Sequence, residues 1–181
     1  VYTHEKTGTD VIGMVVNGNG KPEAENRKMD QDNYKNFGVR INQGIGEFMT
    51  IGGFYYTGKE KGMDTLSRFE NEVTFYGPDL TLGLGNFELT AQYLLRKDSN
   101  PTFITSAKDI ETHGYVMELM WAPDIEISRY YLTGLYNLVD SDIYKYETAT
   151  FSYTYLLSRN LRLLGEYTRD LENERTRRGQ A

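Results

Sequence analysis

Apolar and polar side chains alternate along most of this chain with a period of two residues. In residues 147–157, the side chains of Ala149, Phe151, Tyr153, Tyr155 and Leu157 alternate with those of Thr148, Thr150, Ser152 and Thr154. Successive side chains of a β-strand point to opposite faces, so this pattern predicts a strand with one apolar and one polar face. The same alternation, interrupted by turn residues, predicts nine strands at residues 10–16, 34–43, 48–56, 66–84, 87–96, 114–121, 127–138, 147–157 and 161–170.

The polar face of these predicted strands carries many charges. In residues 161–170, Leu161, Leu163 and Tyr167 share one face, whereas Arg162 and Glu166 share the other. A barrel in a membrane needs an apolar outer face towards lipid, while its inside can be polar and filled with water. The pattern therefore predicts an all-β fold, an antiparallel transmembrane β-barrel that forms one domain over residues 1–181.

The lengths of the connections indicate how the predicted barrel is oriented. Short turns are expected at residues 44–47, 84–86, 122–125 and 158–160. Longer polar stretches lie between them, at residues 17–33, 57–65, 97–113 and 139–146. Antiparallel neighbours turn alternately at opposite ends, so all short turns would lie at one rim and all long loops at the other. This arrangement is typical of outer-membrane barrels.

The segment 66–84 is too long for one uninterrupted alternation. Val73 and Phe75 are odd-numbered apolar residues, whereas the leucines that follow, Leu80, Leu82 and Leu84, are even-numbered. Gly77 and Pro78 lie where the phase changes. Because proline cannot donate a hydrogen bond to a neighbouring strand, we expect a β-bulge at this position.

Composition removes several classes of function. The chain has 181 residues, of which 13% are aromatic and fifteen are tyrosine, and it has no cysteine. It contains no run of eighteen apolar residues, which excludes a transmembrane helix from the printed sequence. Without cysteine there is no disulfide, thiol nucleophile, thiolate metal site or covalent haem attachment. We expect no cofactor, no metal site and no nucleic-acid partner.

Nine strands would leave the predicted barrel incomplete. A bacterial barrel closes with an even number of strands, and an open edge in lipid would leave a row of unpaired backbone groups. We therefore expect at least one further strand. On this interpretation the chain is a fragment that lacks sequence at its C-terminus, and also at its N-terminus.

Two segments carry a resemblance to a known group of proteins. Residues 155–173, YLLSRNLRLLGEYTRDLEN, resemble the penultimate hairpin of Gram-negative outer-membrane porins, and residues 77–101, GPDLTLGLGNFELTAQYLLRKDSNP, are similar in style. The resemblance implies a porin-like barrel of the bacterial outer membrane. The group includes barrels that surround multihaem cytochromes as sleeves in the membrane.

Together the pattern and the resemblance predict a non-enzymatic diffusion channel for small hydrophilic solutes or ions. Charged and polar residues of both signs would line its lumen and set a transverse field. The predicted pore-lining residues are Arg40, Glu70, Glu72, Glu88, Gln92, Arg96, Glu118, Arg129, Arg162 and Glu166.

Aromatic residues near the strand ends would lie at the two membrane interfaces, where an amphipathic ring meets both headgroups and acyl chains. The predicted interface residues are Tyr34, Tyr55, Tyr76, Tyr115, Trp121, Tyr130, Tyr136, Tyr153 and Tyr167. The partners expected for such a barrel are outer-membrane lipid and lipopolysaccharide, with a second copy or a cytochrome as further candidates.

Three alternatives stay open. The barrel could serve as a sleeve that holds a multihaem cytochrome across the membrane. The acid pair Asp140 and Asp142, with Glu111 and His113, resembles in type the paired residues of the omptin proteases and could activate a water. A soluble β-barrel or sandwich that binds a lipophilic ligand would invert the two faces and place the aromatic rings inside.

Overall fold

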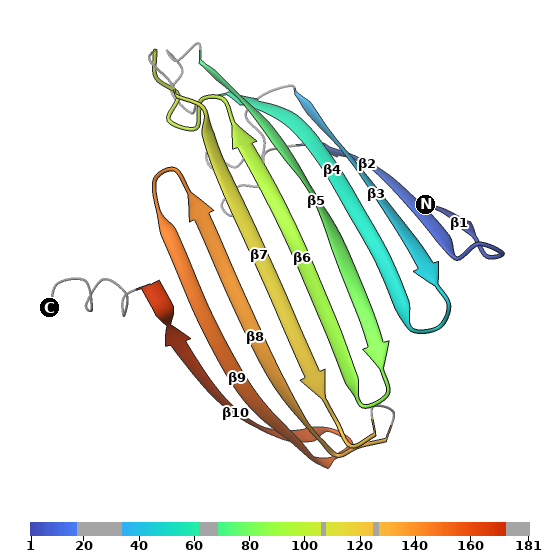
Figure 1. The fold of residues 1–181 in the computed structure, drawn as a ribbon. Coiled ribbons are helices and arrows are strands. Elements are labelled where there is room, and N and C mark those ends of the chain that lie inside the picture. Colours follow the sequence, from blue (N-terminus) through green and yellow to red (C-terminus); the bar gives the residue numbers. More distant parts are fainter. Residues whose placement is uncertain (18–33, 62–68, 106–107, 125–126, 173–181) are drawn as a thin grey trace, which may run out of the picture.

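The described part of the chain forms a single antiparallel sheet of ten strands (Figure 1). The computed structural model describes residues 1–17, 34–61, 69–105, 108–124 and 127–172. The strands are β1 (Tyr2–His4), β2 (Thr9–Asn17), β3 (Lys35–Ile45), β4 (Met49–Lys61), β5 (Glu70–Leu84), β6 (Phe87–Asp98), β7 (Ile110–Trp121), β8 (Tyr130–Ser141), β9 (Lys145–Ser158) and β10 (Leu161–Asp170).

Each strand pairs with its neighbours in the sequence, so the order in space is the order in the chain. The strands at the two ends, β1 and β10, each pair on one side, and the sheet is open. The prediction of an all-β antiparallel fold is confirmed. Closure into a barrel is not observed among the described residues.

The strand count and two connections differ from the prediction. The extra strand is β1, whose three residues are too few to show an alternation. The connection between β8 and β9, expected to be a long loop, consists of only residues 142–144. The connection between β7 and β8, expected to be a short turn, runs over residues 122–129. Sorting all connections by length was therefore wrong. Polar residues such as Asp140 and Lys145 pair directly within the ladder instead of forming a loop.

The predicted bulge at Gly77 and Pro78 is absent. The pairing of β4 with β5 continues without a shift through Phe54 opposite Gly77 and Gly53 opposite Pro78. The pairing of β5 with β6 has the same alignment before and after these residues. A Cβ at Gly77 would lie 1.8 Å from the carbonyl oxygen of Tyr93, so glycine permits a close approach of the two backbones. The prediction of an inserted residue was wrong.

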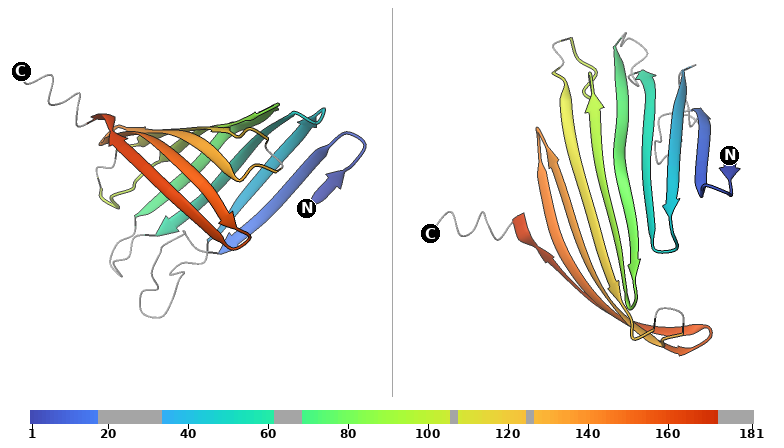
Figure 2. Two further views of the ribbon diagram at one scale, coloured as in Figure 1. Left: turned by 90° about the horizontal axis from the view of Figure 1, so that it is seen from below. Right: turned by 45° about the vertical axis from the view of Figure 1, so that its right-hand side comes forward.

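The sheet is a single curved layer. Its C-terminal strands β8, β9 and β10 bend away from the plane of β2–β6 (Figure 2). The buried apolar side chains among the described residues are Val73, Leu95 and Ala122, which do not form a common core. The stability of this sheet therefore depends on its ladders and on the medium that meets each face.

Candidate functional site

The pairing register divides the side chains into two faces of opposite character. One row across six strands consists of Leu82, Leu89, Leu119, Gly134, Phe151 and Tyr167. The adjacent row, which points to the opposite side, consists of Thr81, Thr90, Glu118, Leu135, Thr150 and Thr168. We call these the apolar face and the polar face.

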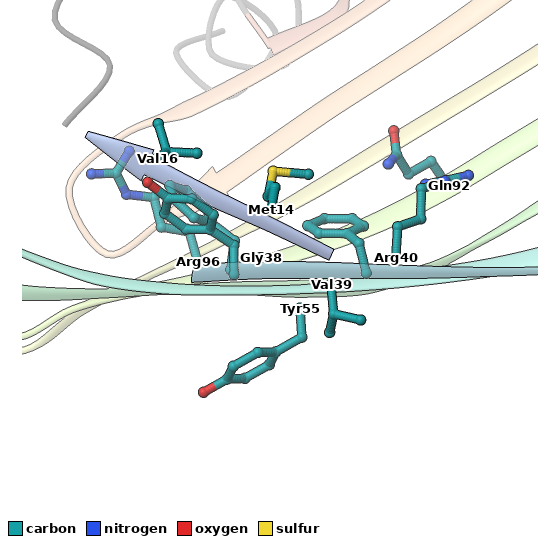
Figure 3. Close-up of a pocket in the computed structure, with 11 residues that line it drawn as sticks. Met14, Val16, Gly38, Val39, Arg40, Tyr55, Gln92 and Arg96 are labelled. Atoms are coloured by element: carbon teal, nitrogen blue, oxygen red, sulfur yellow. The ribbon is translucent and has the colours of Figure 1, made fainter. Parts of the chain in front are cut away.

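The polar face is the concave one. Arg40, Gln92 and Arg96 project from one side of the sheet, and Val39 and Tyr55 project from the other (Figure 3). The faint ribbons of the C-terminal strands lie on the side of Arg40 and Gln92. The apolar face is consequently convex, and its large side chains stay open: Phe37 is 55% exposed, Phe151 54% and Leu163 57%.

Eight of the nine predicted interface aromatics lie on the apolar face: Tyr55, Tyr76, Tyr115, Trp121, Tyr130, Tyr136, Tyr153 and Tyr167. The ninth, Tyr34, precedes β3, and its hydroxyl donates a hydrogen bond to Glu70. At the end of the sheet where β7 finishes, the Trp121 and Tyr130 rings lie 6.4 Å apart. Tyr93 was missed, although it has the parity of Leu89; its ring lies 5.0 Å from that of Tyr115.

Beyond the rings, the apolar face ends in cross-strand ion pairs. Lys59 pairs with Glu72 between β4 and β5. Lys97 Nζ lies 2.5 Å from Glu111 Oε1 between β6 and β7. Between β8 and β9, Lys145 Nζ lies 4.0 Å from Asp140 Oδ2. All three pairs lie at the same end of the sheet. At that end the apolar face therefore carries charged side chains instead of apolar ones.

The grouping of Glu70 and Glu72 with the polar-face residues was wrong. Without a bulge, the even-numbered residues of β5 stay on one side, so Glu70 and Glu72 share the apolar face with Leu80. Their partners across the ladder are Lys61 and Lys59. Both glutamates belong to the charged end of the convex face.

Of the other predicted pore-lining residues, seven lie on the polar face: Arg40, Glu88, Gln92, Arg96, Glu118, Arg162 and Glu166. The eighth, Arg129, directly precedes β8, and its backbone carbonyl accepts a hydrogen bond of 2.6 Å from Leu156 of β9. Sequence reasoning missed Asp79 and Asp98, which also belong to this face. The parity of Asp79 relative to Leu80 could have identified it, had no bulge been expected.

One ion pair on the polar face joins two strands that are not neighbours. Arg40 of β3 donates from Nη2 to Asp79 Oδ1 of β5 at 2.8 Å. The intervening residue of β4 is Gly52, and a Cβ there would lie 2.5 Å from Asp79 Oδ1. The other carboxylate oxygen of Asp79 is buried and has no hydrogen-bond partner among the described residues. Arg40 is therefore the group that compensates the charge of Asp79.

A second network holds Arg96. Its Nε and Nη2 donate to Asp98 at 2.5 and 2.7 Å. Asp98 also accepts a hydrogen bond of 2.9 Å from Asn71, whose amide donates in addition to Glu60 at 2.9 Å. The Asn71 amide oxygen accepts from the backbone N–H of Asn100 at 2.8 Å, and Asn71 is 0% exposed. These bonds fix the carboxylate of Asp98, and through it the guanidinium of Arg96.

The residues of the protease alternative lie at the charged end of the apolar face. His113 is directly opposite Asp140 in the ladder, and its Nδ1 lies 2.8 Å from the Tyr93 hydroxyl. Glu111 is paired with Lys97, and Asp142 Oδ2 accepts from the backbone N–H of Glu111 at 3.1 Å. Glu111, His113 and Asp140 therefore lie on the convex side, away from the polar face, and Asp142 lies in the turn that follows β8. Among the described residues no three His, Asp or Glu side chains form a metal site.

Comparisons with protein-family models, with curated proteins and with solved structures found no match. In the described ranges, no helix has the length and apolar character needed to cross a membrane. Function must accordingly be inferred from the two faces of the sheet and from the side chains that they carry.

Proposed function

We propose that this chain forms part of the wall of a bacterial outer-membrane porin, through which small hydrophilic solutes or ions diffuse. The observation that supports this proposal is the contrast between adjacent cross-strand rows, one apolar on the convex side and one polar on the concave side. In a porin the convex face meets lipid and the concave face meets water.

The apolar face has the chemistry of a lipid contact. Large side chains such as Phe151 and Leu163 stay more than half exposed, and each forgoes about 2 kcal/mol of burial if water covers it. A bilayer provides that burial without a second protein layer. The aromatic rings near both ends of the strands and the ion pairs beyond them match the interface and headgroup levels.

Strand length supports a complete crossing. The strands β6, β7 and β8 have 12 residues each. At a rise of about 3.3 Å per residue such a strand is about 40 Å long. Tilted by about 40°, it spans about 30 Å, which is the thickness of the hydrocarbon core.

The proposal requires that the two free edges of the sheet be paired. In lipid an unpaired row of backbone N–H and C=O groups costs several kcal/mol per group. The outer edges of β1 and β10 are unpaired in the described sheet. A pore therefore needs a pairing partner at both edges, which closes the wall around the polar face.

The test is electrical and uses the absence of cysteine from the chain. The protein reconstituted in planar bilayers should give stepwise conductance. In the variant Glu118→Cys, a charged thiol reagent that does not cross membranes should change the conductance, because Glu118 belongs to the polar face. The matched variant Leu119→Cys, one residue further along β7 and on the apolar face, should be unaffected.

Two results would contradict the proposal. Equal responses of the two cysteine variants would show that the faces do not meet different media. A bilayer that stays silent while a haem protein co-purifies would replace the pore by a sleeve around a cytochrome.

A further inference from the structure

A cavity of about 640 Å³ lies on the polar face, over the N-terminal half of the sheet (Figure 3). Its lining includes the guanidinium-bearing residues Arg40 and Arg96, the amide of Gln92 and the aromatic rings of Phe54, Tyr56 and Phe75. These residues come from four consecutive strands, β3 to β6. The cavity therefore combines cationic, neutral polar and aromatic groups at one place on the wall.

The charges around this cavity are unevenly placed. The side chains of Arg40 and Arg96 are 33% and 40% exposed, whereas those of their partners Asp79 and Asp98 are 15% and 5% exposed. Neither aspartate lines the cavity, and no other acidic residue does so. In a chain with a net charge of −6, this cavity is thus bordered by cations whose counter-charges lie beneath them. Such an arrangement favours an anion.

Hydrogen-bond donors remain for that anion. A guanidinium has five N–H groups, and Arg40 commits Nη2 to Asp79. Gln92 lies opposite Asp79 in the ladder, and its side chain forms no hydrogen bond with another described residue. Both donors therefore flank the same carboxylate and are available on its cavity side. A guanidinium edge together with an amide N–H suits a carboxylate.

The rings of Phe54, Tyr56 and Phe75 form an apolar surface beside these donors, which we call the apolar shelf. Phe54 lies directly opposite Arg40 in the ladder, and the Tyr56 and Phe75 rings are 5.4 Å apart. The Tyr56 hydroxyl accepts a hydrogen bond of 2.8 Å from Asn36, which fixes its polar end away from the shelf. Glycine at position 38 lies opposite Tyr56, and the Met14 side chain of β2 fills the space above it, 2.8 Å from where a Cβ would lie. Met14 thus adds an apolar contact beside the rings.

We propose that this cavity binds a small organic anion that carries one negative charge and a flat apolar ring, the chemistry of an aromatic carboxylate. The carboxylate contacts Arg40 and Gln92, and the ring lies against Phe54 and Tyr56. The consequence for transport, that the pore favours solutes of this class, rests on the proposed function. The binding site itself does not require the pore to conduct.

The first test measures binding to the protein in detergent, by isothermal titration calorimetry with benzoate. A ligand of this size with one good ionic contact should bind with a Kd of about 1 mM. Acetate, which lacks the ring, and benzyl alcohol, which lacks the charge, should each bind at least about tenfold more weakly, since each loses one of the two contacts. Equal binding of benzoate and benzyl alcohol, or no saturable binding of benzoate, would overturn the proposal.

Variants then locate the site. Phe54→Leu and Gln92→Leu should each weaken benzoate binding about fivefold, because each removes one contact and leaves the Arg40–Asp79 pair intact. Arg40→Lys keeps the charge but loses the planar donor fork, and a similar loss is expected. The control Arg162→Gln removes a polar-face arginine on β10, outside the cavity lining, and should leave the Kd unchanged. A loss in Arg162→Gln together with no loss in Phe54→Leu would mean that benzoate binds by charge alone and would reject the site.

Failure of this inference and failure of the porin proposal are separable. Saturable benzoate binding with no conductance would keep the site and reject the pore. Conductance that depends on residue 118 with no benzoate binding would keep the pore and reject the site.

Discussion

Arg40 and Asp79 form an ion pair across the full width of the strand that lies between them. Their Nη2 and Oδ1 atoms are 2.8 Å apart, although the residues belong to β3 and β5. The contact exists because Gly52 of β4 has no side chain to occupy the space between them. The missing side chain of Gly52 thus allows a positive and a negative group of the polar face to pair.

Replacing Gly52 should therefore separate the ion pair. Gly52→Ala places a Cβ 2.5 Å from Asp79 Oδ1 and 2.8 Å from Asn42 Oδ1, and we expect a loss of about 2 kcal/mol in the free energy of unfolding. Urea unfolding in lipid vesicles measures it. The control is Gly134→Ala, where a Cβ would meet nothing within 4 Å. Equal stability of the two variants would show that the pair contributes nothing.

Gly77 should tolerate substitution least among the glycines of β5. A Cβ at this position would lie 1.8 Å from the carbonyl oxygen of Tyr93, which is backbone and cannot move without separating β5 from β6. We expect Gly77→Ala to lower stability by more than about 3 kcal/mol or to prevent folding. In Gly53→Ala, the nearest atom is the Gly77 carbonyl oxygen at an ordinary 3.6 Å. Heat-modified mobility on gels should show folded protein for Gly53→Ala and little for Gly77→Ala.

The assignment of the two faces predicts opposite effects for neighbouring residues of β7. Leu119→Lys puts a charge on the apolar face, where a position near the bilayer centre costs about 2–4 kcal/mol. Glu118→Lys, on the polar face, should change stability by less than about 1 kcal/mol, because water reaches that side. Unfolding in phospholipid vesicles measures both. The reverse order, with Glu118→Lys the more damaging, would mean that lipid does not cover the convex face.

Asn71 should be the most sensitive asparagine of the polar face. It is fully buried and links Glu60, Asp98 and the backbone N–H of Asn100. Asn71→Ala removes one hydrogen bond from each of these groups and leaves the buried N–H of Asn100 without its acceptor, which should cost about 2–3 kcal/mol. The control Asn137→Ala removes an amide that makes no hydrogen bond within the described ranges and lies on the same face. A cost below about 1 kcal/mol for Asn71→Ala would contradict the role assigned to this network.

Where apolar and polar residues alternate without interruption, the sequence predicts correctly on which face of the sheet each side chain lies. In β9 and β10 the parity of Phe151, Tyr153 and Leu163 placed all three on one side, and the register agrees. It failed in β5, where Val73 and Phe75 point to the polar face although they are apolar. A bulge would have kept the apolar residues of β5 on one face, and its absence places Glu70 and Glu72 on the apolar face. Side-chain character there follows the local cluster around Arg96, which stacks over the Phe75 ring at 5.0 Å.

The contacts of the candidate site were beyond sequence reasoning for a different reason. Arg40 and Asp79 are 39 residues apart in the chain. Their meeting depends on the alignment of three strands and on a glycine between them. Periodicity says on which face a residue lies, but not which residue lies opposite. The ion pairs at the strand ends were missed in the same way, because Asp140 and Lys145 have the composition of a loop.

The simple order of the strands has a consequence for how such a wall is made. Every described strand pairs with its immediate neighbours along the chain. Each strand can therefore pair with the one formed before it, and the contacts within the sheet are local in sequence. The seam between the first and last strands of a closed cylinder is the exception, since it joins residues that are far apart in the polypeptide. In the proposed porin, sealing that seam would be the slow step of assembly. Protection of the two unpaired edge strands until then would limit the loss of protein to aggregation.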